Sequence, residues 1–441
     1  MPNLPQPSEI RDWKKVAIDY DHLVFDPDAQ GLYFPLVAFA PAGQFNYPDN
    51  KAILLDTYVG SIYHHNQAEA INIMPAIIGA TLAGIDKSNQ AGIDYVAKLK
   101  DFYNLKTGQK LYLNNYFGVT GDDWWYEVMP NVFFLQLKKL YPQCYPEAEE
   151  HMYSVANQWA LCVKTLGGSE TPWAAPQMNY RAFNFKTLKP LGVGVPEPEA
   201  AGAIAWILFH IYEQSGNKTY RIAAEQAMDF LNQLTTNPSY ELQLAYGVAA
   251  AARMNAILGT DYNLEEMLGW CFEKGPLRGW GSIKGSWGGY DVSGLIGEVS
   301  ADENTGYAFS MNGFQQAGAL APVPKYDKRF ARSMAKWLLN LANASRLFYS
   351  NYLPSQQQDN YSWSSQYDTQ SCIPYEALKA PWQGWPIFAR GDALAGGWAN
   401  TNLSLYSGSS VGYLAAIIHS VSHQSILVIN MNVSWFLAGT F

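Results

Sequence analysis

DDWWYEVMPNVFFLQLKKL, residues 122–140, has a strong helical pattern. Two aspartates open it and Lys138 and Lys139 nearly close it, so both ends complement the dipole of a helix. Apolar residues fill its interior. The sequence therefore predicts a long, largely buried helix here.

Further helical segments arrive on both sides of this stretch, mostly in pairs separated by turn residues such as Ser215-Gly216-Asn217. The predicted helices are 67–84 and 92–103, 122–140 and 146–166, 197–214 and 220–234, 241–258 and 264–274, 307–320 and 325–347, with 409–421 left without a clear partner. Paired helices predict stacked helical hairpins. Alternating strands and helices, which would predict a parallel sheet, are missing.

About eleven helices in hairpins predict an all-α fold, a closed (α/α)6 toroid of six hairpins; an open helical array is the alternative. No sequence repeat of fixed period is present, which disfavours a solenoid of identical units. We expect an extended N-terminal segment over 1–60, the toroid over 61–424, and a strand-like segment over 425–441, which would cap the helices or begin a truncated β-domain.

Three long connections interrupt the helices, at 167–196, 275–306 and 348–408. They exceed the usual length of loops, so we expect them to be functional or to carry short strands. They are rich in Gly, Trp, Tyr and Asn, which predicts ordered segments.

The composition excludes some classes of function. Charged residues make up only 15% of the 441 residues, aromatic residues also 15%, and the formal net charge is −9. Because no run of Lys and Arg is present to neutralise phosphates, we expect no nucleic-acid partner. No apolar run is long enough to span a bilayer, so no membrane span is expected.

The four cysteines, Cys144, Cys162, Cys271 and Cys372, form no C-x-x-C pair. We interpret them as buried free thiols, with disulfides as the alternative. The N-terminus lacks the pattern of a secretory signal. The protein is therefore cytoplasmic, or secreted or periplasmic if a leader has been removed.

The first candidate site is the start of the 122–140 helix. Asp122 and Asp123 lie beside Trp124 and Trp125, with Glu127 close behind. Helix capping accounts for one carboxylate, but not for three. Carboxylates move protons or attack an anomeric carbon, and flat aromatic faces hold sugars, so the cluster predicts a carbohydrate-cleaving site.

A second acidic segment precedes the predicted helix at Tyr307. It contains Glu298, Asp302 and Glu303, and a Gly- and Trp-rich stretch that includes Trp287 comes before it. Acidic residues are also favourable at a helix start simply because they complement the helix dipole. We predict a catalytic role for the three acids and substrate binding for Trp287 and Tyr307.

Weaker candidates for substrate binding lie elsewhere: His64, Glu199, Trp382 and Trp385. Glu199 is also explained as an acid at a helix start after a proline. His65 and Glu69 share a helical face at i, i+4, but no third ligand accompanies them, so no metal and no cofactor are expected.

With the 122–125 acids and tryptophans, the 298–307 segment and the paired helices over roughly 60–422, the chain resembles the six-hairpin glycosidase superfamily. That superfamily comprises many glycoside hydrolases and some polysaccharide lyases. The resemblance implies an (α/α)6 toroid with acids and aromatic residues at one mouth. It assigns no individual family.

The sequence therefore predicts a glycoside hydrolase that cleaves a poly- or oligosaccharide with two carboxylates, Asp123 and either Glu303 or Glu298. Enzymes of this superfamily are often inverting. The resemblance therefore implies that the two carboxyl groups lie about 6.5–9.5 Å apart, with a water molecule between them. The first alternative is a lyase, using His64, His65, Tyr307 and Arg390. The second is a non-catalytic glycan-binding protein. We expect a carbohydrate substrate and a monomer or weak oligomer.

Overall fold

The computed structural model describes residues 1–66, 68–299, 306–380, 384–391 and 393–422. Helices are the main regular elements of the fold, and short strands lie between them in the long connections. No helix in these ranges has the length and apolar character required to cross a membrane.

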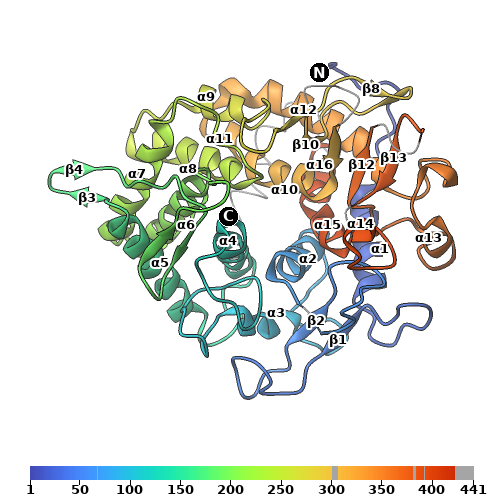
Figure 1. Ribbon diagram of the computed structural model, residues 1–441, viewed down its shortest axis with the longest axis horizontal. Coiled ribbons are helices and arrows are strands. Elements are labelled where there is room, and N and C mark those ends of the chain that lie inside the picture. Colours follow the sequence, from blue (N-terminus) through green and yellow to red (C-terminus); the bar gives the residue numbers. More distant parts are fainter. Residues whose placement is uncertain (67, 300–305, 381–383, 392, 423–441) are drawn as a thin grey trace.

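Six helices form a closed ring around the centre of the molecule (Figure 1). Each packs against the next, and the last packs against the first. In ring order they are α2 (Ala70–Ala83), α4 (Trp124–Leu140), α6 (Ala200–Ser215), α8 (Gln243–Leu258), α10 (Ser310–Leu320) and α16 (Val411–Ser422). Their residues are buried on nearly every face, as expected for helices with neighbours all round.

Shorter or more amphipathic helices lie outside the ring. They are α1 (Trp13–Val24), α3 (Tyr95–Lys98) continued by a 3₁₀ turn (Leu99–Phe102), α5 (Ala148–Thr165), α7 (Lys218–Asn232), α9 (Leu264–Trp270), α11 (Val323–Tyr326) and α12 (Ala331–Ala344). In α7 the buried residues Tyr220, Ala223, Ala227 and Leu231 repeat at helical spacing. One face therefore packs inward and the other faces solvent.

Glycine pairs allow the ring helices to approach closely. A Cβ added to Gly412 in α16 would lie 2.1 Å from the Cα of Gly79 in α2. A Cβ added to Gly202 in α6 would lie 2.7 Å from the Cα of Gly247 in α8. Any side chain at these crossings would push the two helices apart.

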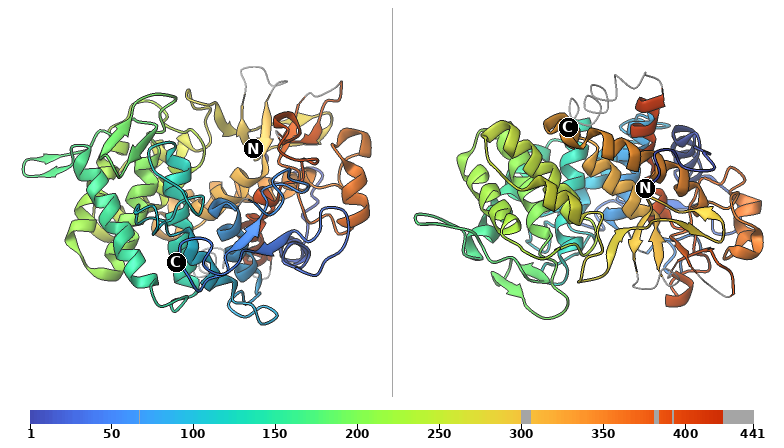
Figure 2. Two further views of the ribbon diagram at one scale, coloured as in Figure 1. Left: turned by 60° about the horizontal axis from the view of Figure 1, so that its bottom comes forward. Right: turned by 90° about the horizontal axis from the view of Figure 1, so that it is seen from above.

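The long connections carry short strands, as expected. A five-stranded antiparallel sheet has the order β13-β12-β11-β10-β7 and lies on one side of the helices (Figure 2). Its strands are β7 (Trp280–Ser282), β10 (Ile296–Glu298), β11 (Tyr307–Phe309), β12 (Ala377–Lys379) and β13 (Phe388–Arg390). Because β11 leads directly into α10, the sheet stands at the N-terminal end of a ring helix.

The remaining strands and short helices lie in the connections. Two-stranded sheets join β1 (Val37–Phe39) to β2 (Ile53–Leu55), β3 (Ser169–Glu170) to β4 (Trp173–Ala174), β5 (Ala182–Asn184) to β6 (Lys189–Leu191), and β8 (Ser286–Trp287) to β9 (Tyr290–Asp291). Short helices are α13 (Tyr361–Tyr367), α14 (Ala393–Gly396) and α15 (Leu405–Gly408).

Two predictions about the chain need correction. Residues 1–60 are not simply extended, because α1 lies within them, capped by Asp12 and buried through Trp13, Val16, Tyr20 and Val24. The predicted helix at 307–320 begins only at Ser310, since Tyr307–Phe309 pairs with β10 and β12. The predicted strand at 425–436 lies outside the described residues. All four cysteines are buried and free, as interpreted from the sequence.

Candidate functional site

Carboxylates precede four of the six ring helices. Glu69 precedes α2, Asp123 precedes α4, Glu199 precedes α6, and Glu241 lies two residues before α8. Residues at the starts of α2, α4 and α8 line one cavity, and Glu199 accepts backbone N–H groups at the start of α8, so these four starts gather at one mouth. The positive ends of the helix dipoles favour negative charge there.

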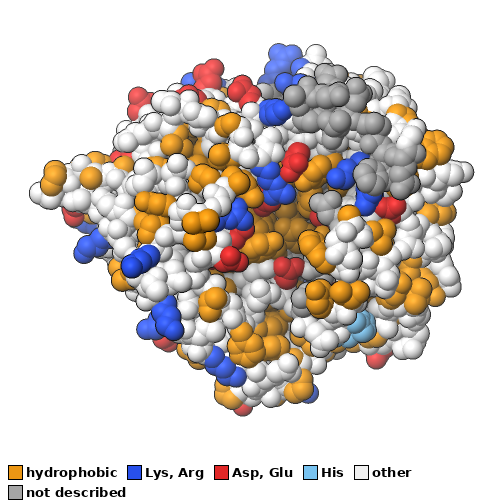
Figure 3. Space-filling model, in the orientation of Figure 1, with side chains coloured by type: hydrophobic (Ala, Val, Ile, Leu, Met, Phe, Trp, Pro, Cys, Tyr) orange, Lys and Arg blue, Asp and Glu red, His pale blue; other side chains and the backbone are white. Residues whose placement is uncertain are grey.

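A cavity of about 490 Å³ opens at this mouth, and the space-filling view shows charged side chains around a hollow with an apolar floor (Figure 3). Its charged and amide side chains are Glu69, Asn115, Glu241, Arg278, Asn312 and Glu376. Its aromatic side chains are Tyr58, Tyr63, Trp125, Tyr126, Trp280, Phe309, Trp398 and Tyr406. The cavity thus combines carboxyl groups with aromatic surface.

Glu241 is a largely buried acid of this cavity. Its side chain is only 16% exposed and forms an ion pair with Arg278. Burial, with smaller contributions from the charges of Asp123 and Glu199, raises the pKa of Glu241 to about 7 against the opposing effect of Arg278. The carboxyl group is therefore able to hold a proton near neutral pH.

Glu69 is held by two donors from neighbouring segments. The Thr57 hydroxyl donates to one carboxylate oxygen, and the Asn114 amide donates to the other over 2.7 Å. These two hydrogen bonds fix the orientation of the Glu69 carboxyl group. Glu69 and Glu241 thus present carboxyl groups with different surroundings to the same cavity.

Glu376 is the third acid of the cavity and is buried. Burial of Tyr58, followed by the charge of Glu376 nearby, raises the pKa of the Tyr58 hydroxyl well above its ordinary value. Tyr58 therefore stays a neutral phenol beside the acid. This phenol is a suitable hydrogen-bond partner for Glu376.

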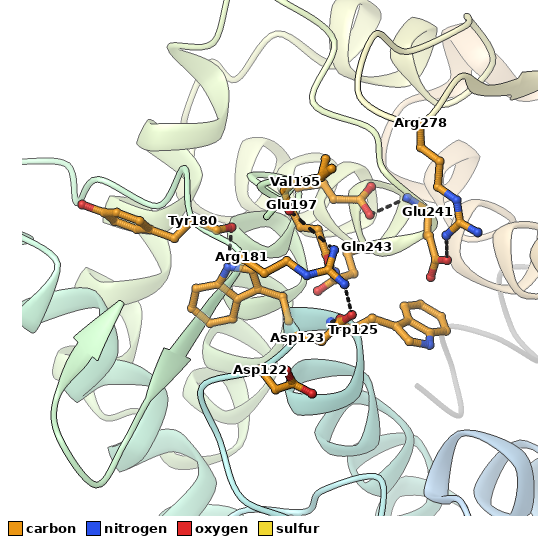
Figure 4. A network of polar contacts seen from close by, with 12 residues as sticks. Asp122, Asp123, Trp125, Tyr180, Arg181, Val195, Glu197, Glu241, Gln243 and Arg278 are labelled. Atoms are coloured by element: carbon orange, nitrogen blue, oxygen red, sulfur yellow. Dashed lines mark hydrogen bonds and ion pairs between the residues drawn. The ribbon is translucent and has the colours of Figure 1, made fainter. Parts of the chain in front are cut away.

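Behind the cavity wall, Arg181 joins Asp123 to Glu197 (Figure 4). One guanidinium nitrogen pairs with Asp123, and the other lies 2.5 Å from Glu197. Burial, followed by the negative charge of Asp123, raises the pKa of Glu197 against the opposing charge of Arg181. Asp123 also accepts the backbone N–H of Trp125 over 2.9 Å, which makes it the N-cap of α4.

Tyr240 connects this network with the cavity. The guanidinium carbons of Arg181 and Arg278 lie 5.2 Å and 5.3 Å from the centre of its ring. Arg278 donates to Glu298 over 2.9 Å, and the Tyr307 hydroxyl donates to the same carboxylate over 3.0 Å. Polar contacts therefore extend from β10 and β11 to the start of α4.

Several residues predicted from the sequence meet at this mouth. Trp125 lines the cavity, and Asp123 lies close enough to Glu241 to raise the pKa of that acid. Glu298 accepts hydrogen bonds from Arg278 and from the Tyr307 hydroxyl. Asp122 lines a second cavity beside the first. These residues remain candidates for catalysis or binding.

Other predicted residues lie away from the cavity or serve other contacts. Trp124 is fully buried, with its indole 6.0 Å from that of Trp159. Glu199 is fully buried and accepts the backbone N–H groups of Glu241 and Leu244, so it caps the start of α8. These contacts give both residues a structural role.

The remaining candidates are more peripheral. His64 is half exposed and lies 3.4 Å from Asp56. Trp287 lines a separate cavity of about 310 Å³ together with Glu298. Trp385 is partly exposed, whereas Asp302, Glu303 and Trp382 lie outside the described residues. Within the described ranges, no group of three or more His, Cys, Asp or Glu side chains is arranged to hold a metal ion.

Sequence reasoning considered Glu69 only as a neighbour of His65 and missed Glu241, Glu376 and Arg278. For Glu69 and Glu241 a signal was present, because each stands just before an Ala-rich, almost wholly apolar helix. Nothing local marks Glu376 or Arg278, which reach the cavity from the long connections.

Comparison with known proteins assigns no family. No family model matches the chain, and no curated protein matches it. Among solved structures, a D-mannose isomerase aligns with a TM-score of 0.47 at 11% identity, over 93% of this chain and 98% of that one. A structure described as a wild-type glycosidase aligns with a TM-score of 0.29 at 12% identity, over 92% and 96% of the two chains.

Proposed function

We propose that the protein is a glycoside hydrolase that cleaves a poly- or oligosaccharide, and that its fold is an (α/α)6 toroid. Support for the toroid comes from the closed ring of six helices and from the outer helices that alternate with them along the chain. Such an alternation turns every ring helix the same way. The acids at the helix starts then share one mouth.

The observation that carries the proposal is the presence of Glu241 and Glu69 in one cavity lined by aromatic side chains. Glycoside hydrolysis requires two carboxyl groups with different protonation, one to donate a proton and one to act as a base or nucleophile. The surroundings of Glu241 and Glu69 support this division of roles.

In the proposed mechanism Glu241 is the general acid. Its proton passes to the glycosidic oxygen as the bond to the anomeric carbon breaks. Glu69, oriented by Thr57 and Asn114, takes a proton from the attacking water or attacks the anomeric carbon directly. The products are two sugars with free hydroxyl groups, at the net cost of one water molecule.

This assignment gives Asp123 a positioning role, because its carboxylate is already engaged by Arg181 and by the start of α4. Its negative charge helps keep Glu241 protonated. The pairing of Asp123 with Glu298 or Glu303 stays a prediction.

A polysaccharide lyase is the second candidate, favoured by one observation: Arg278 lines the cavity beside Tyr126 and Tyr406. An arginine is suited to hold a uronate carboxylate. However, burial and then the charge of Glu241 raise the pKa of the Tyr406 hydroxyl well above its ordinary value. A phenol in such surroundings is a poor base, so hydrolysis is the better-supported reaction.

The test is a panel of oligosaccharides and chromogenic glycosides assayed for release of reducing ends and for ultraviolet absorption of an unsaturated product. The rate of hydrolysis by Glu241→Gln and by Glu69→Gln should be about 10²- to 10⁴-fold lower than that of the wild type. Glu149→Gln, on the exposed side of α5, is the matched control and should retain activity.

Three results would overturn the proposal. Full activity in both variants would remove these acids from the reaction. An unsaturated product would assign a lyase. Glycan binding without turnover of any substrate would assign a non-catalytic glycan-binding protein.

A further inference from the structure

A second cavity of about 600 Å³ adjoins the candidate active site. Glu69, Asn115 and Tyr126 line both cavities, so the two meet at the proposed catalytic base. We call the second one the distal cavity; its other lining residues include Phe45, Asn66, Phe117, Val119 and Asp122. A ligand held at Glu69 has a direct path into it.

The distal cavity presents apolar and aromatic side chains to solvent. The Phe117 side chain is 53% exposed and Tyr126 is 42% exposed. The ring of Phe45 lies 5.4 Å from that of Phe117 and 4.3 Å from the buried Tyr116, which supports it from behind. Exposed aromatic rings held in place at a cavity mark a binding surface.

Polar groups suited to sugar hydroxyls lie in the same wall. Figure 4 shows the side chain of Asp123 turned toward Arg181 and that of Asp122 turned away from it. Among the described residues the Asp122 carboxylate, which is exposed, makes no hydrogen bond or ion pair. The amides of Asn66 and Asn115 also line the cavity.

We infer that the distal cavity binds further sugar units of the same glycan whose scissile bond lies at Glu69 and Glu241. The substrate is therefore an oligosaccharide or polysaccharide that spans both cavities, with sugar faces on Phe117 and Tyr126 and hydroxyl groups on Asp122. This inference rests on the proposed function and adds a second binding site for its substrate. A single sugar unit with a small leaving group would leave the distal cavity unfilled.

The experiment compares chain lengths. The probes are nitrophenyl monosaccharides and the matching cello-, manno-, xylo- and malto-oligosaccharides, from disaccharide to hexasaccharide. For the wild type, kcat/KM should rise with length. In Phe117→Ala the ratio of kcat/KM for the hexasaccharide to that for the nitrophenyl glycoside should fall about threefold to tenfold, the usual contribution of an aromatic contact.

Asp122→Ala should lower the same ratio about tenfold through loss of a charged hydrogen-bond acceptor. The matched control is Trp173→Ala, an aromatic residue that is 48% exposed on the hairpin β3–β4, which projects away from the mouth (Figure 1). In this control the ratio should stay at the wild-type value. An unchanged ratio in both distal variants, or no dependence on chain length, overturns the inference while the proposed function stands.

Binding separates this inference from a failure of the proposed function. If no probe is hydrolysed, calorimetric titration of the same hexasaccharides into the wild type and Phe117→Ala decides the matter. Weaker binding by the variant supports the distal cavity as a glycan site without catalysis. Equal binding, or none, overturns the inference.

Discussion

Arg278 forms an ion pair with Glu241. Its positive charge lowers the pKa of Glu241, whereas burial raises it. The pair sets the protonation of the proposed general acid. Since the pKa of Glu241 is about 7, we predict that kcat/KM falls tenfold per pH unit above about pH 7. A pH–rate profile of the wild type measures this limb.

Removal of Arg278 should shift the pH at which kcat/KM begins to fall, the alkaline limb of the profile. Without the positive charge the pKa of Glu241 rises, so in Arg278→Met the loss of activity should begin at a higher pH than in the wild type. The control is Arg221→Met, which removes an arginine paired with Glu225 on the outer helix α7. A limb that stays in place in Arg278→Met would contradict the assignment of Glu241 as the acid.

Glu127 should make the stability of the protein depend on pH. Its buried carboxyl group accepts the backbone N–H groups of Gly121, Asp122, Asp123 and Phe183. Burial nevertheless raises its pKa from an ordinary value near 4.5 to about 7. The folded state therefore binds this proton more tightly than the unfolded state does.

It follows that the contribution of Glu127 is fully present below about pH 4.5 and is lost as pH rises to about 7, by about 3 kcal/mol. The free energy of unfolding from denaturant titrations at both ends of this window measures the loss. In Glu127→Gln, which does not titrate, the difference should shrink by that amount. An identical pH dependence in the variant would contradict the prediction.

His151 should act in the opposite direction. Its ring is buried, hydrogen-bonds the hydroxyls of Tyr47 and Tyr112 over 2.8 Å each, and stacks on Tyr103. Burial lowers its pKa from 6.5 to about 3. The unfolded state takes up this proton first, so stability is lost as pH falls from about 6.5 to about 3.

His151→Phe should cost about 2–4 kcal/mol at neutral pH, because both tyrosine hydroxyls lose a buried partner. It should also lessen the loss of stability on acidification. The control is His22→Phe on the exposed side of α1, for which a change within about 0.5 kcal/mol is expected. Equal effects of the two changes would contradict the role given to His151.

The closure of the ring can be tested at a glycine. In Gly412→Ala the new Cβ would lie 2.1 Å from Gly79, so we expect α16 and α2 to separate, with a loss of about 3 kcal/mol or a failure to fold. Gly269→Ala in α9 is the control, because its nearest atom is 3.8 Å away. It should be neutral or stabilising by up to about 1 kcal/mol, as measured by thermal unfolding.

The positions of most helices could be predicted because they depend on local pattern. The predicted break at Ser215-Gly216-Asn217 is where Gly216 adopts a left-handed φ of 68° and Asn217 caps α7. Where local pattern and tertiary context disagree, the context prevails. Residues 307–309 continue a helical pattern, yet they pair with strands from both neighbouring connections.

The candidate site was predicted only in part. Adjacent tryptophans have the same local signal, yet Trp124 packs on Trp159 in the core and Trp125 lines the cavity. Asp123 and Glu241 both precede ring helices, but each pairs with a different arginine that is distant in sequence. Arg181 pairs with Asp123, and Arg278 pairs with Glu241.

The helical segments, the breaks between them and the acids and aromatic residues at helix starts follow from local pattern, because they are properties of neighbouring residues. Which acids share a cavity, and which are held by arginines or backbone N–H groups, depends on how distant segments pack together. The reason is physical: burial and the contacts between segments far apart in the chain set the protonation and orientation of each carboxyl group.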